Sequence, residues 1–132
     1  AVELWTEAAE LDSIQALYNL GVAYDRGEGV EKDVAKAAVF YEKAAMQGCP
    51  LSRHRLGCYE IKFRGNYDRA VRHFLISAKM GHEESVETIK EMFKAGVATK
   101  EQYAEALKGY QDSVEEMKSC DRDEAKRLHD RQ

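Results

Sequence analysis

The stretch "ALYNLGVAYDRGEGVEKDVAKAAVFYEKAAMQG", residues 16–48, contains two apolar patterns of helical period on either side of a short polar segment. In each pattern the apolar or small residues recur three or four positions apart, which places them on one face of a helix. These positions are Leu17, Leu20, Gly21 and Tyr24 in the first pattern and Ala37, Tyr41, Ala44 and Ala45 in the second. The stretch therefore predicts two helices that each present one apolar face.

The polar segment contains Gly27 and Gly29, a pair that suits either a phosphate-binding loop or a chain reversal. A phosphate loop lies between a strand and a helix, with further glycines or a Lys-Ser/Thr pair following. Here the glycines follow a helical pattern and neither feature is present. Because glycine just past a helix end commonly adopts the left-handed conformation that stops the helix, we expect this segment to turn the chain.

The two patterns recur later in the chain. Leu56 and Gly57 stand 36 residues after Leu20 and Gly21, and "RAVRHFLISAKMG" at 69–81 repeats "KAAVFYEKAAMQG" at 36–48 with an offset of 33. Partial matches occur at 4–12 and 85–93. Recurrence at such a period is typical of helical repeat proteins.

Local signals set the predicted helix ends. Ser13, Asp33 and Asn66 precede helical patterns and are expected N-caps, and Pro50 suits a first helical turn. After Gly96 the capping-box pattern "TKEQ" at 99–102 begins a last helix, whose apolar stripe predicts docking through Met117 and fraying beyond it. Gly21 and Gly57 lack a Cβ, so a partner helix can approach closely, and Tyr41 and Phe74 are expected to fill the space between successive pairs.

The pattern L-G-x-x-Y, G-x-G-V, D-x-x-K-A, K-A-A and a closing Q-G over residues 16–48 resembles the Sel1-like repeat, a relative of the tetratricopeptide repeat. The second repeat departs from it by lacking the double-glycine loop. The resemblance implies an all-α fold, a right-handed α-solenoid of antiparallel helix pairs with a C-terminal capping helix. Its expected parts are the second helix of a partial repeat (2–12), two repeats (14–48 and 50–81), the first helix of a further repeat (83–95), and the capping helix with a tail (99–132).

The family's implied function is a scaffold for protein–protein interaction, which binds a peptide or helix of another protein on the concave face of the array. Tetratricopeptide geometry implies that a set of first-helix residues points into this concavity. The set is Tyr18, Val22, Asp25, His54, Cys58, Ile61, Lys62 and Glu87. An enzyme would instead need a closed pocket with convergent polar groups.

Composition narrows the alternatives. The chain has 132 residues and a net charge of −4. It has no apolar run long enough for a bilayer, which favours a soluble protein. Its three cysteines lack CxxC spacing, which favours a reducing, intracellular setting. Because it begins with Ala1, we expect a processed product or a piece of something longer. The partial repeat at 2–12 predicts either preceding repeats or self-association through that end.

Few residues in the sequence are candidates for metal binding or catalysis. His54 and Cys58 share a helix face, with Cys49 near in sequence, but a zinc site needs a fourth ligand, so we expect no metal and no cofactor. No nucleophile motif indicates catalysis. Residues 51–81 carry 7 basic and 2 acidic side chains, with a basic group made of Arg53, Arg55, Lys62, Arg64, Arg69 and Arg72. This group suits a solvated face or docking of an acidic peptide, and nucleic acid is disfavoured by the acidic flanking repeats.

Overall fold

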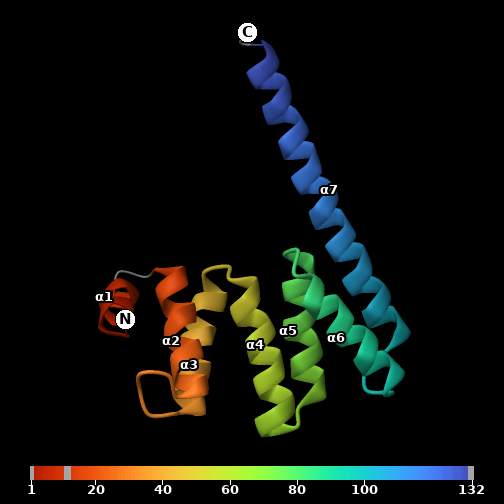
Figure 1. Cartoon of the computed structure of the whole chain (residues 1–132). Helices are drawn as coiled ribbons and strands as arrows, with labels where there is room; N and C mark the ends of the chain where they lie inside the picture. Colours follow the sequence, from red (N-terminus) through yellow and green to blue (C-terminus); the bar gives the residue numbers. More distant parts are fainter. Residues whose placement is uncertain (1, 11–12, 131–132) are drawn as a thin grey trace.

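The computed structural model describes residues 2–10 and 13–130, which are helical throughout apart from short connections (Figure 1). Residues 11 and 12, the end of the predicted segment 2–12, and residues 131 and 132, the end of the predicted tail, lie outside the described residues. The elements are α1 (Val2–Glu10), α2 (Ile14–Arg26), α3 (Val34–Met46), α4 (Pro50–Tyr59), the π-helical turn η1 (Glu60–Arg64), α5 (Tyr67–Lys79), α6 (Glu83–Lys94) and α7 (Lys100–Asp130).

The helices α2 to α6 stand side by side in chain order, each antiparallel to the next, with α1 at one end and α7 at the other (Figure 1). Contacts between helices join neighbours along the chain, as expected of a solenoid, while α7 packs on both α5 and α6. The predicted fold class, an all-α solenoid of helix pairs with a C-terminal helix, is confirmed. Within the described part of the chain, no helix combines the length and apolar character that crossing a membrane requires.

Side-chain caps begin the helices where the sequence predicts them. Each predicted cap accepts a hydrogen bond from the backbone N–H three residues later: Ser13 from Ala16, Asp33 from Lys36, and Asn66 from Arg69. These bonds satisfy donors that a helix N-terminus otherwise leaves unpaired. Cys49 is the N-cap of α4, which begins at Pro50, and its sulfur accepts a hydrogen bond from the Ser52 N–H at 3.4 Å.

The glycine pair turns the chain, as predicted. Gly27 adopts a left-handed conformation with φ of 72°, and its N–H donates to the carbonyl of Ala23 at the end of α2. Gly29 also has a positive φ, of 76°. The connection therefore stops one helix and reverses direction toward the next, with no strand before it.

Two glycines bring the helices of each pair together. A Cβ on Gly21 would lie 2.5 Å from Cε1 of Tyr41, and one on Gly57 would lie 2.6 Å from Cε1 of Phe74. Each aromatic ring therefore lies directly over a glycine of its own repeat, a contact that the sequence interpretation had placed between successive pairs. The rings also belong to core clusters that extend to the next first helix, since Tyr41 and Leu56 share one cluster and Phe74 and Ile89 share another.

The second repeat ends its first helix differently from the first repeat. After Tyr59 the helix continues as η1, and Gly65, with φ of 60°, closes it by donating to the carbonyl of Glu60. A π turn inserts one residue into a helix and rotates the following side chains by about 100° relative to those before it. This turn replaces the glycine-rich loop and was not predicted from the sequence.

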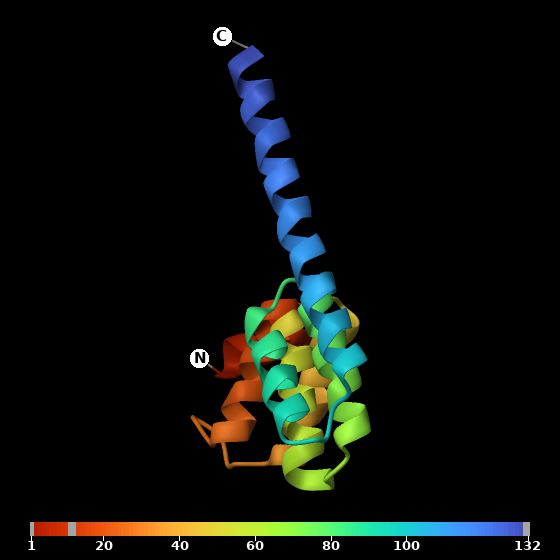
Figure 2. The same ribbon diagram turned by 90° about the vertical axis from the view of Figure 1, so that its right-hand side faces the viewer.

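The last helix covers the end of the array and then extends beyond it (Figure 2). The predicted capping box is present, because Thr99 and Gln102 exchange hydrogen bonds between side chain and backbone. Ala106 is fully buried, whereas Met117 is 66% exposed. The predictions of docking through Met117 and fraying after it are therefore wrong, since α7 leaves the core before Met117 and stays helical to Asp130.

Candidate binding grooves

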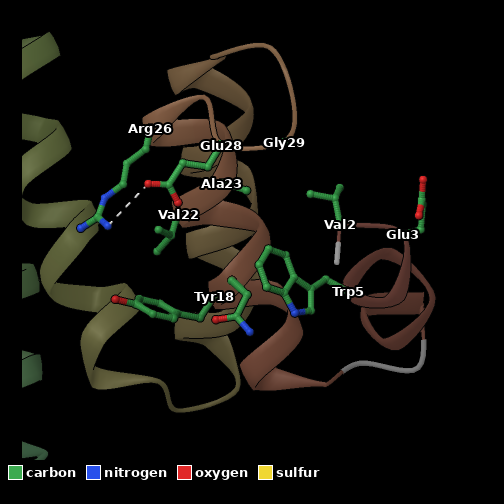
Figure 3. A pocket seen from close by; sticks show the side chains of 10 residues that line it. Val2, Glu3, Trp5, Tyr18, Val22, Ala23, Arg26, Glu28 and Gly29 are labelled. Carbon is green, nitrogen blue, oxygen red and sulfur yellow. Dashed lines mark ion pairs between the residues drawn. The ribbon is translucent and has the colours of Figure 1, made fainter.

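The first groove lies between α1 and α2 and encloses about 600 Å³. Trp5 projects toward α2 from α1, while Arg26 and Glu28 form an ion pair of 4.0 Å at its edge (Figure 3). Its lining side chains include Val2, Trp5, Tyr18, Asn19, Val22 and Arg26. Its floor is mainly apolar and its edge is charged, a combination common in pockets that bind apolar side chains.

The second groove is smaller, about 160 Å³, and lies between the first helix pair and α4 with η1. Its lining side chains include Asp25, Ala38, Tyr41, Arg55, Cys58 and Lys62. The hydroxyl of Tyr41 donates to Oδ2 of Asp25 at 3.3 Å. Burial, and then the Asp25 carboxylate, raise the pKa of Tyr41, so its phenol stays protonated and keeps donating.

These two grooves occupy equivalent positions in successive repeats. Their shared positions are 36 residues apart: Val2 and Ala38, Trp5 and Tyr41, Asn19 and Arg55, Val22 and Cys58, and Arg26 and Lys62. Tyr18 joins the two grooves, because it lines the first while its ring points toward α4 and packs 6.0 Å from the ring of Tyr41 (Figure 3). They therefore form one surface that continues along the array.

The third groove lies between the second helices α3 and α5, with α4 below them, and encloses about 610 Å³. Its charged lining residues are Glu42, Arg53, Glu60, Arg64, Arg69 and Arg72. Glu60 is only 7% exposed, and its Oε2 has no hydrogen-bond partner among the described residues. The Nε of Arg53 is likewise buried without a hydrogen-bond partner among those residues.

Three titratable groups in and around the grooves have pKa values shifted in favour of the neutral form. Partial burial raises the pKa of the Cys58 thiol, which disfavours the reactive thiolate. Burial also lowers the pKa of His73, with Arg53 and Arg69 acting in the same direction. Burial lowers the pKa of His54 to about 4.

His54 lies in a polar cluster between α4 and the start of α6. Its Nδ1 is 2.7 Å from Oγ of Ser85, and its Nε2 is 3.7 Å from Oε1 of Glu84. His82 packs edge-on against the His54 ring at 5.0 Å between centroids, and its Nε2 is 3.6 Å from Oε2 of Glu84. The cluster contains neither Cys58 nor Cys49, the residues that spacing had associated with His54.

A sequence profile of the Sel1 repeat matches residues 14–49 and 50–82, which together make up more than half of the chain. The chain belongs to the Sel1 repeat family. The predicted family is thereby confirmed. Sel1 repeats generally mediate protein–protein interaction.

Among curated relatives, this Sel1 repeat chain is 30% identical over 93 residues to a sel1-like repeat-containing protein of Acanthamoeba polyphaga mimivirus, a match covering 70% of the chain and 17% of that protein. A Sel1 repeat protein from Oxalobacter formigenes has the same fold, with a TM-score of 0.71 at 23% identity over 82% of this chain and 48% of that one. The protective antigen c5321 of uropathogenic Escherichia coli, which displays an SLR fold, has a TM-score of 0.69 and 29% sequence identity. That match covers 86% of this chain and 25% of the antigen. The chain thus spans less than half of each of these proteins.

The residues predicted for the concave face separate into several environments. Tyr18 and Val22 line the first groove, and Asp25, Cys58 and Lys62 line the second. The other three lie outside both grooves. His54 is 6% exposed and belongs to the polar cluster, Ile61 packs against the core beside Phe74, and Glu87 is exposed.

Sequence reasoning missed the residues that second helices contribute to the grooves. Trp5 and Tyr41 face the first helix of the next repeat, so they line grooves that the predicted set assigned to first helices alone. The 36-residue offset between these two aromatic residues was the available signal. His82, which the sequence did not connect with His54, is half-buried at the start of α6.

Proposed function

We propose that this Sel1 repeat chain is an interaction scaffold and that one segment of another protein lies along its first and second grooves. The observation that carries the proposal is the equivalence of the two grooves, joined by Tyr18. A surface that repeats along a solenoid suits an extended or helical ligand that follows the array.

The side chains that line the two grooves indicate which residues the partner segment carries. The first groove offers Trp5, Tyr18 and Val22, which can surround a large apolar side chain. In the second groove Asp25 already accepts from Tyr41, and Lys62 is exposed without an ion pair among the described residues. The partner segment therefore carries an apolar anchor and an acidic residue, the latter placed to pair with Lys62.

A role as a scaffold needs no reactive group, and the groups near the grooves are poorly suited to catalysis. Cys58 is exposed, but partial desolvation raises the pKa of its thiol and so disfavours the thiolate, and the Tyr41 phenol donates to Asp25. The first groove is also partly open to the surface rather than enclosed (Figure 3). We therefore assign no catalytic residues.

Selection from a random peptide library, followed by calorimetric titration of a selected peptide, tests this function. We expect enriched peptides to combine an apolar anchor with an acidic residue. Tyr18→Ala and Lys62→Glu should each weaken binding at least about tenfold. Matched controls are Tyr67→Ala and Lys108→Glu, which change exposed side chains outside both grooves. Equal effects of test and control variants, at unchanged helicity, would remove the site assignment.

A second candidate function is favoured by the third groove, where four arginines and two glutamates are interleaved with apolar side chains. Val39 is 50% exposed and Met46 is 76% exposed. Exposed apolar side chains have no counterpart in a phosphate backbone, so an acidic amphipathic peptide is a better complement than nucleic acid. Binding of such a peptide should be lost in an Arg69→Glu/Arg72→Glu double variant. If the chain instead bound single-stranded nucleic acid more tightly than the peptide, the third groove would be assigned to nucleic acid.

A further inference from the structure

Three side chains that bind transition metals converge between α4 and α6, outside the three grooves. His54 comes from α4, and His82 and Glu84 come from the start of α6. One ligand atom from each lies within 4.8 Å of the other two. We propose that these three residues form a binding site for a divalent transition-metal ion of the Zn²⁺ type.

Direct bonds among the three side chains do not explain their convergence. Each Nε2 lies 3.6 to 3.7 Å from the nearer Glu84 oxygen, which is longer than a hydrogen bond. The Nε2 of His82 is also buried and has no hydrogen-bond partner among the described residues. Buried polar atoms are normally satisfied, so this nitrogen lacks the partner that a metal ion would supply.

The surroundings of His54 are those of a metal-binding histidine. Ser85 is fully buried, and its Oγ lies 2.7 Å from Nδ1 of His54. In the tautomer whose Nδ1–H donates to this oxygen, the lone pair of Nε2 is available on the side of Glu84. Phe74 packs against the imidazole at 5.0 Å between ring centroids and limits its rotation.

The donor set selects the class of metal. Two imidazoles and one carboxylate suit Zn²⁺ and related transition metals, whereas Ca²⁺ and Mg²⁺ prefer sets made of oxygen alone. Around a tetrahedral Zn²⁺ the ligand atoms lie roughly 3.3 Å apart. The Glu84 side chain is 70% exposed and can move toward the two imidazoles, whose rings rotate to complete the site, and a water molecule fills the fourth position.

Such an ion would link successive repeats. His54 belongs to the second repeat, and the other two ligands begin the helix that packs on it. Because the ion binds the folded state, it stabilises that state in proportion to its occupancy. The proposal is independent of the grooves and of any partner segment.

The test is titration of the chelator-treated chain with Zn²⁺ by calorimetry, with thermal unfolding at each metal concentration. We expect one ion per chain and a rise in unfolding temperature. Glu84→Gln should raise the dissociation constant at least about tenfold. Glu83→Gln is the matched control, because it makes the same change one position earlier on the same helix and should leave binding unchanged.

Two further measurements separate this site from others in the chain. Co²⁺ bound to His and Glu gives d–d absorption without a thiolate charge-transfer band, so such a band would overturn the assignment by revealing a cysteine ligand. His82→Asn should weaken Zn²⁺ binding as Glu84→Gln does, while asparagine still suits the position before the helix. Absence of saturable binding, or equal affinity in the Glu83 and Glu84 variants, would also overturn it.

Discussion

The ring of Tyr41 covers Gly21 so closely that a Cβ at that position would lie 2.5 Å from Cε1 and 2.6 Å from Cδ1 of the ring. Because Tyr41 is itself buried, it has little space into which to move. Gly21→Leu should therefore destabilise the fold by about 1–3 kcal/mol or more, the usual range for overpacking. Chemical denaturation followed by circular dichroism measures this change.

Ala35→Leu is the control for that substitution, because it adds the same side chain at an exposed position of α3. Its effect on the free energy of unfolding should stay within about 0.5 kcal/mol. If the Gly21→Leu chain were as stable as the control, the repeat register that pairs this glycine with Tyr41 would be wrong.

The helices and their ends could be predicted from the sequence because they depend on neighbours along the chain. Asn66 and Thr99 each cap a helix through a residue only three positions away. The repeat register could be predicted as well, because the 36-residue recurrence of Leu20-Gly21 imposes the same packing twice.

The sites depend on packing between residues that are distant in the sequence, so they were harder to predict from the sequence than the helices. His54 and Glu84 are 30 positions apart in sequence, and only the docking of α6 on the second repeat brings them together. Ile61 was expected in the binding surface, but it follows the start of the π turn and packs against the core.

The capping box of α7 provides a local test of how the last helix begins. Thr99→Ala removes the hydroxyl that accepts from the Gln102 N–H at 3.1 Å. Loss of an N-cap costs about 1 kcal/mol, so urea denaturation should show a decrease of that size in the free energy of unfolding. Thr88→Ala changes a threonine that bonds within its own helix and should cost less. Equal losses would argue against a role for the box.

The outer part of α7 should contribute little to stability. Met117 is 66% exposed and Leu128 is 58% exposed, so removal of residues 118–132 should change the free energy of unfolding by less than about 0.5 kcal/mol. Ala106→Asp, by contrast, places a charge at a fully buried position and should cost more than about 2 kcal/mol. A large loss on shortening would mean that the outer part of the helix packs on the array in solution.

Acidification should destabilise the fold in part through His73. Burial and the cations Arg53 and Arg69 lower its pKa in the folded chain below the ordinary value of 6.5, while Glu60 and Glu42 oppose this shift. The unfolded chain therefore binds the proton first, and the stability that depends on neutral His73 is full above pH 6.5 and is lost as the pH falls below it.

His73→Gln isolates this contribution, since it leaves an acceptor near Arg53 but cannot titrate. Denaturation curves recorded between pH 5 and 8 should show the parent losing more stability than the variant on acidification. The contribution of His54 is common to both proteins and cancels in the difference. Parallel pH dependences of the two chains would show that His73 is not responsible.

A single partner segment that occupies both equivalent grooves should bind as one unit. Calorimetry with a selected peptide should then give one peptide per chain, with Tyr18→Ala and Lys62→Glu each reducing the affinity of that same peptide. Cutting the peptide between its apolar anchor and its acidic residue should leave halves that bind about 100-fold or more weakly, because linkage makes the second contact intramolecular. Two peptides per chain, or a half that binds as tightly as the whole, would mean that Trp5 and Lys62 belong to separate sites.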